Sequence, residues 1–173
     1  MGVMGDRFGF VARVRGLALA LPAAALLSAA GPGPAAAAGL FTGFPGEWTG
    51  TGDVTMTDGS RDRIKCKASY SAGPSGQALN INVNCASDNY RVNIIANVVA
   101  QGEGFSGSWR ETTRQVSGDV TGRVPAPGQY QASLQGTGFG LELAASSNGK
   151  VQAITINAQG TDVQNVRISL RKV

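Results

Sequence analysis

The chain has 173 residues, of which 25 are glycine, 15% are charged and 6% are aromatic, a mixture typical of antiparallel β domains with many short turns. It has no histidine and two cysteines, which excludes His-based catalytic triads, His-ligated zinc and Cys₄ metal or iron–sulfur centres. The formal net charge is +4, and part of it lies near the N-terminus. We therefore expect one domain, with no metal and no cofactor.

Residues 1–38 are predicted to be a cleavable signal peptide. A basic start precedes an uncharged apolar stretch over 16–30, and the segment ends in small residues, with Ala36 and Ala38 suited to the −3 and −1 positions. The apolar stretch is shorter than the about 20 residues that a membrane-spanning helix needs. Cleavage is expected after about Ala38, which predicts a periplasmic or secreted protein without stable membrane insertion.

Residues 39–45 are predicted to be an extended lead-in, and residues 46–173 to form a single β domain. Its first strand is expected over 46–56, where Trp48 and Val54 share one face because side chains alternate along a strand.

A stripe of cations is predicted on the next strand, 61–71, where every second residue is basic. Arg61, Arg63, Lys65 and Lys67 therefore share one face. The stripe fits either an anion-binding surface, for nucleic acid, lipopolysaccharide or acidic lipid, or a solvated strand face that cations protect from edge pairing. The second interpretation is favoured, and no nucleic-acid partner is expected.

Cys66 and Cys85 are predicted to form a disulfide between neighbouring strands. The segments 61–71 and 77–86 each alternate apolar and polar residues, and the Gly-Pro-Ser-Gly sequence at 73–76 favours a turn between them. Both cysteines fall on the apolar faces at nearly equal distances from this turn, so they are expected to be directly opposed. The bridge implies an oxidising compartment, and closing a loop of about 20 residues stabilises the fold by about 3 kcal/mol in the chain-entropy model.

The rest of the chain repeats this alternation. The segment 90–100 has an unusually apolar outer face at Ile95 and Val99, which predicts that a terminal segment or a partner covers it. Further strands are predicted over 104–112, 116–124, 130–134, 139–143, 150–158 and 163–172. The fold class is therefore all-β, an antiparallel up-and-down meander of about eight to ten strands closed as a barrel, with a β-sandwich as the alternative.

Gly46-Glu47-Trp48 on the first strand, with Arg167 and Arg171 on the last, resembles the G-x-W signature of lipocalins and the wider calycin group. The resemblance implies a calycin-like barrel in which Trp48 plugs one end and one of the two arginines packs across its indole ring, as a cation–π contact. The chain is also similar to small exported proteins of alphaproteobacteria whose functions are mostly unassigned.

No catalytic constellation is recognisable, and we expect that the protein is not an enzyme. Without histidine, proton transfer would fall to carboxylates such as Glu111 and Asp119, which are candidates by residue type alone. Gly136-Thr137-Gly138 lacks the lysine and the following helix of a phosphate-binding loop. Asp58-Gly59 is typical of a hairpin turn and lacks the spacing of a calcium-binding loop.

The favoured function is an exported binding barrel for a small apolar or amphipathic ligand. Inward aromatic residues are candidates to line the cavity, although core packing is the favoured interpretation of each one taken singly: Tyr70, Tyr90, Phe105, Trp109, Tyr130 and Phe139. An alternative is a periplasmic protein-interaction or inhibitor module that uses the outer face of 90–100. A small outer-membrane barrel is disfavoured, because the aromatic residues are too few to form two girdles.

Overall fold

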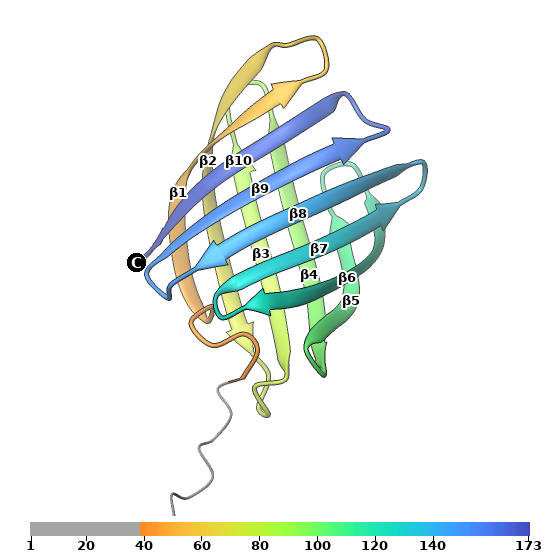
Figure 1. Ribbon diagram of the computed structural model, residues 1–173. Coiled ribbons are helices and arrows are strands. Elements are labelled where there is room, and N and C mark those ends of the chain that lie inside the picture. The colour runs from red at the N-terminus through yellow and green to blue at the C-terminus, as the bar shows by residue number, and fades with distance from the viewer. Residues whose placement is uncertain (1–38) are drawn as a thin grey trace, which may run out of the picture. The chain divides into compact units, whose positions relative to one another are not determined.

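The computed structural model describes residues 39–173, and the predicted signal peptide lies outside the described residues. The described residues form ten strands: β1 (Gly46–Met56), β2 (Arg61–Ala72), β3 (Ala78–Ala86), β4 (Arg91–Gln101), β5 (Gly104–Glu111), β6 (Val116–Ala126), β7 (Gln129–Gly136), β8 (Phe139–Ser147), β9 (Val151–Gln159) and β10 (Val163–Lys172). Each strand pairs antiparallel with the next, and β10 pairs with β1 to close a barrel (Figure 1). The all-β meander is confirmed, and its closure excludes the sandwich alternative.

Each strand has one inward and one outward face, as the alternation of the sequence predicts. On β2, the inward side chains of Ile64, Cys66 and Tyr70 are at most 5% exposed, whereas Lys65 and Lys67 between them are exposed. Burial of the alternate apolar residues drives the strand onto the barrel core, at about 25 cal/mol per Å² of apolar surface removed from water.

The disulfide between β2 and β3 is confirmed. Cys66 and Cys85 are direct partners in the β2–β3 register, with a Cα–Cα distance of 4.1 Å. Both lie on the inward face and are buried. The bridge therefore fixes the register of this hairpin from inside the barrel.

Residues 39–45 are not extended, in contrast to the sequence-based prediction. The amide N–H groups of Thr42 and Phe44 donate to the carbonyls of Gly39 and Phe41, at 2.8 and 3.1 Å, which folds the segment into consecutive turns. This compact form buries Phe41 and Phe44, which are 4% and 9% exposed, in the barrel core. The segment lies between the β2–β3 and β8–β9 turns and caps that end of the barrel.

Three inward aromatic rings lie directly across from glycines on neighbouring strands. A Cβ atom at Gly122 would lie 2.2 Å from the ring of Phe105. The glycines therefore leave the space that the rings occupy. The pairs are Phe105–Gly122, Trp109–Gly118 and Phe139–Gly136.

Candidate functional site

The capped end of the barrel contains a cluster of aromatic side chains that includes two of the predicted cavity residues, Tyr70 and Tyr130. The ring of Phe44 makes edge contacts with both, at centroid distances of 5.3 and 4.7 Å. The Tyr130 hydroxyl donates to the carbonyl of Leu40 at 3.1 Å. At this end the two tyrosines hold the N-terminal segment in place.

Trp48 belongs to the same cluster through an edge contact with Tyr70. It is 1% exposed, and its indole N–H donates to the carbonyl of Phe44 at 2.8 Å. The cation over its ring is Lys172, with Nζ 5.4 Å from the ring centroid, and not an arginine. Arg167 and Arg171 are exposed. They alternate with the inward residues of β10, so both lie on the outer face, where they pair with Asp53 and Thr49 of β1.

Three further predicted cavity residues point into the barrel. Phe105 contacts Phe41 at a centroid distance of 5.8 Å, and Trp109 contacts Phe139 at the same distance. The indole N–H of Trp109 also donates to the carbonyl of Asp119 at 3.2 Å. These rings pack against other rings, so they form part of the core.

Tyr90 does not line the interior. It precedes β4 in the β3–β4 loop and is half-buried, outside the hydrophobic core. The Arg114 guanidinium lies 4.6 Å from the centroid of its ring. Because β4 begins at Arg91, the alternation that directs Val92 inward does not extend to Tyr90.

A buried polar pair, which the sequence analysis missed, lies inside the barrel. The Tyr70 hydroxyl donates to Oε1 of Gln152 at 3.1 Å, and Gln152 is 2% exposed. Burial raises the pKa of Tyr70, so the hydroxyl stays protonated to a pH above its usual pKa of 10.0. Nε2 of Gln152 is buried and has no hydrogen-bond partner. One feature of the sequence could have revealed this pair. Gln152 is an amide at an inward position of β9, and the next two inward positions are Ile154 and Ile156.

The inward apolar side chains of β8 and β9 are only partly buried. Leu141, Leu143 and Ala145 on β8 keep exposed surface, as does Ile154 on β9. Leu170 on the adjacent strand β10 and Ile64 on β2 are 0% and 2% exposed. Inward apolar residues of other strands, such as Ile81, Val83 and Val166, are also only partly buried. Packing inside the barrel is therefore uneven, and β8 and β9 belong to its less filled part.

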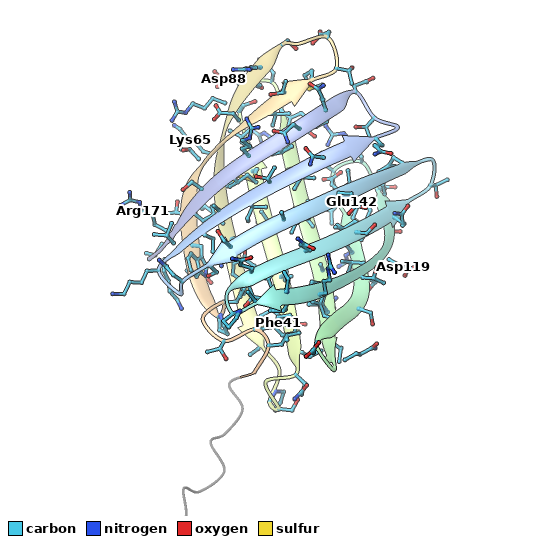
Figure 2. All side chains as sticks on the ribbon, in the orientation of Figure 1. Phe41, Lys65, Asp88, Asp119, Glu142 and Arg171 are labelled. Atoms are coloured by element: carbon cyan, nitrogen blue, oxygen red, sulfur yellow. A yellow bond between two sulfur atoms is a disulfide. The ribbon has the colours of Figure 1, made fainter. Side chains whose placement is uncertain are left out.

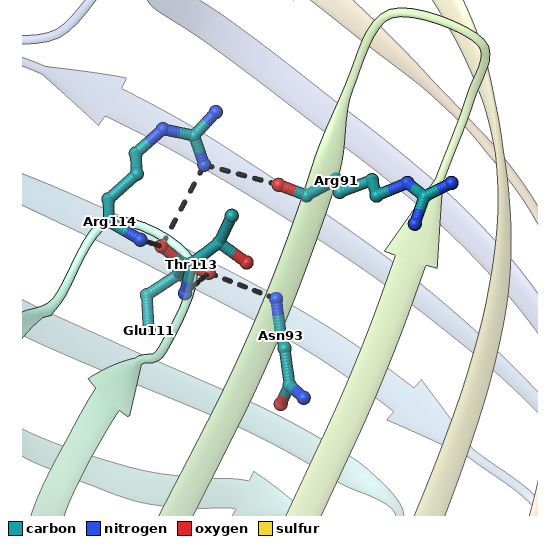
Figure 3. Close-up of polar contacts among 5 residues, drawn as sticks. All are labelled: Arg91, Asn93, Glu111, Thr113 and Arg114. Carbon is teal, nitrogen blue, oxygen red and sulfur yellow. Dashed lines mark hydrogen bonds and ion pairs between the residues drawn. The ribbon is translucent and has the colours of Figure 1, made fainter.

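Glu111 is a buried carboxylate at the end of β5, and it organises the β5–β6 turn (Figure 3). Its oxygens accept backbone N–H bonds from Asn93, Thr113 and Arg114 at 3.0, 2.8 and 2.6 Å. Burial raises the pKa of Glu111, but these bonds outweigh that effect and hold the pKa below its usual range. Because its hydrogen bonds at these distances all come from backbone N–H groups, we interpret Glu111 as a structural group.

An outer groove of about 940 Å³ crosses five adjacent strands, β10, β1, β2, β3 and β4. Lys65, Lys67, Arg91 and Arg171 line it, and no aspartate or glutamate does. Figure 2 shows Lys65 and Arg171 extending from the same side of the barrel, with Asp119 on the other side. The other outward polar residues of the groove are Thr49, Thr51, Asn84, Asn93, Thr113 and Ser169.

The outer face of β4 is partly open. Val99 is 48% exposed, whereas Ile95 is half-buried between its cross-strand neighbours Asn82 and Arg110. The N-terminal segment, residues 39–45, lies at the end of the barrel and not over this face.

Within residues 39–173, no three His, Cys, Asp or Glu side chains gather at a spacing that could hold a metal ion. The same residues contain no helix that is long and apolar enough to cross a membrane.

Comparison with known proteins supports the architecture. No protein-family model and no curated protein matches the chain. Among solved structures, the chain is similar to a protein of unknown function from the DUF3598 family of Nostoc punctiforme, with a TM-score of 0.54 and 12% sequence identity. The match covers 76% of this chain and 48% of that protein, so the chain spans about half of its length. At this identity, the likeness shows the fold alone.

Proposed function

We propose that the protein is an exported, non-enzymatic binding protein that holds one small apolar or amphipathic molecule inside its barrel. The observation that carries the proposal is the partial exposure of inward apolar side chains along β8 and β9, such as Leu143 and Ile154. Small barrels are either filled by their own side chains or hold one ligand, and a filled interior packs as densely as an organic crystal. The aliphatic part of a ligand, lying along the inward faces of β8 and β9, would complete that packing.

The polar end of the ligand is assigned to Gln152. The Tyr70 hydroxyl forms a hydrogen bond with one of the two polar atoms of the Gln152 amide. Whichever way the amide is turned, its other polar atom has no hydrogen-bond partner in the protein. An unpaired buried amide costs about 1–3 kcal/mol, which a carbonyl or hydroxyl of the ligand would offset. An amphipathic ligand therefore suits this interior better than a hydrocarbon.

The distribution of polarity supports a barrel that works in water. Inward strand positions are mainly apolar, and the outward positions of β2, β3 and β10 carry lysine, arginine and asparagine. A transmembrane barrel requires the reverse on its lipid-facing side. Export is supported by the Cys66–Cys85 disulfide, which suits an oxidising compartment, and by the composition of residues 1–38.

A pair of adjacent substitutions on β8 tests the proposal. Ala145→Trp places a large ring on the inward face, whereas Ala144→Trp places the same ring on the exposed outward face. With 1-anilinonaphthalene-8-sulfonate as the probe, we expect wild type and Ala144→Trp to bind in a titration followed by fluorescence, and Ala145→Trp to lose binding. Circular dichroism checks that both variants keep the β-sheet spectrum. Native mass spectrometry of protein purified from exporting cells should show an added mass that Ala145→Trp lacks. Equal probe binding by the two variants would contradict the proposal.

A further inference from the structure

The outer groove has a basic lining that edge protection does not explain. Cations on the face of a strand guard against pairing with other chains where the strand is a sheet edge. In this barrel β2 pairs with β1 on one side and β3 on the other, and β10 is paired with β1, so no strand of the barrel is an edge. Edge protection therefore does not account for Lys65 and Lys67.

The strand register explains why the cations form a groove. Lys65 and Arg91 flank Ala86 in one lateral row, and Lys67 and Arg171 flank Thr49 in the next. Each row therefore has two long cationic side chains as walls and a small residue as floor. Partners two strands apart are separated by about 10 Å, and neighbouring rows on one face by about 7 Å.

The groove cations are not neutralised by the protein. In the described part of the chain the ion pair formed is Arg114–Glu111, in the β5–β6 turn, and no carboxylate pairs with the groove cations. Like charges placed side by side repel one another, so the groove is favourable for an anion that supplies several negative charges.

The remaining lining indicates which anion fits. The cations are spread over two rows and do not converge on one point, which suits a polymer with a charge on successive units better than a single phosphate group. The floor offers the hydroxyls of Thr49, Thr51 and Ser169 and the amides of Asn84 and Asn93, which hydrogen-bond to sugar hydroxyls.

Two other polyanions fit the groove less well. Its lining has no aromatic side chain, which single-stranded nucleic acids use as a stacking platform. None of the exposed large apolar side chains, Val99, Val151 and Val173, belongs to it, so it has no group to insert into a lipid surface. We propose that this groove binds an acidic polysaccharide, with Lys65, Lys67, Arg91 and Arg171 pairing with its carboxylates.

The test compares two double substitutions that remove the same charge from different faces. Lys65→Gln/Lys67→Gln removes two groove cations, and Arg110→Gln/Arg123→Gln removes two exposed cations from β5 and β6, outside the groove. Binding of fluorescently labelled oligogalacturonate is measured by anisotropy at low ionic strength. A neutral maltooligosaccharide of the same length serves as the uncharged control, and thermal unfolding checks each variant.

We expect wild type to bind oligogalacturonate, and binding to weaken as salt screens the cations. The groove variant should bind about tenfold more weakly, as the loss of two charge pairs predicts, and the control variant within about twofold of wild type. Lys65→Arg/Lys67→Arg should retain binding, because it keeps both charges. Equal weakening in the control variant, no binding at low salt, or tighter binding of single-stranded DNA or phosphatidylglycerol vesicles would overturn the proposal.

Discussion

At the scale of single residues, Glu111 shows how the barrel accommodates a charge that it buries. The β5–β6 turn would leave the N–H groups of Thr113 and Arg114 without partners, and the carboxylate accepts from both. It also accepts from the N–H of Asn93 on the neighbouring strand β4. The Arg114 guanidinium adds a long contact of 3.8 Å to the same carboxylate and donates to the Arg91 carbonyl at 3.3 Å. The turn is therefore organised by one side chain, and its stability depends on the charge of that side chain.

Glu111→Gln is expected to destabilise the protein by on the order of 3 kcal/mol at neutral pH, because charged acceptors make the stronger hydrogen bonds. The pKa of Glu111 is lower in the folded chain than in the unfolded chain, so its stabilising effect is present above the usual carboxyl range and is lost as the pH falls through the folded value. Urea unfolding followed by tryptophan fluorescence, between about pH 7 and pH 3, should show a weaker acid dependence in Glu111→Gln than in wild type.

The control for this prediction is Glu142→Gln, which makes the same charge change at an exposed position of β8. It should leave both the stability at neutral pH and its acid dependence close to wild type. Parallel acid profiles for Glu111→Gln and wild type would show that the carboxylate does not stabilise the turn.

At the scale of strands, the pairing of glycine with inward aromatic rings sets how closely β5 to β8 pack. The Phe105 ring occupies the place where a side chain at position 122 would lie. A glycine has no side chain to pack against its neighbours. An aromatic ring on the paired strand that covers the glycine supplies the missing side-chain contact. The many glycines inside these strands therefore shape the core as well as the turns.

Gly122→Ala should cost about 2 kcal/mol of stability, since the new Cβ would meet the Phe105 ring at 2.2 Å and the Gln131 carbonyl at 2.7 Å. Gly140→Ala on β8 is the matched control, because its Cβ would make an ordinary contact of 3.4 Å with the flexible Gln135 side chain. That variant should be neutral or slightly stabilising. Thermal unfolding of the two variants checks the difference, and equal melting temperatures would refute this account of the glycine.

At the scale of the whole molecule, the capped end links the N-terminal segment to opposite walls of the barrel. Phe44 lies between Tyr70 of β2 and Tyr130 of β7, and the hydroxyls of the two tyrosines bond to Gln152 and Leu40. Burial raises the pKa of both tyrosines above the usual value of 10.0. Ionising either hydroxyl would place a charge inside the cap.

Alkaline pH should therefore unfold the cap and destabilise the barrel. A group whose pKa is raised by folding stabilises the protein below its usual pKa, and that contribution is lost as the pH rises toward the folded value. We expect stability to fall above about pH 10, and Tyr70→Phe to reduce this dependence. Tryptophan fluorescence during an alkaline titration, with phenolate absorbance recorded in parallel, measures it. Phenolate formation at both tyrosines without a fluorescence change would contradict the role of the cap.

The sequence by itself determined the strands and one register. Alternation at period two is local, so it predicted nearly every strand, the inward direction of Trp48 and Tyr130, and the opposition of Cys66 and Cys85 around a short turn. Tertiary structure decided what depends on neighbours far apart in the chain. The β1–β10 register pairs Trp48 with Lys172, so the cation over the indole ring is a lysine and not an arginine. The groove exists because closure of the barrel places β10 beside β1. Lateral neighbours on a barrel wall are fixed by closure and stagger, which leave no local signal in the sequence.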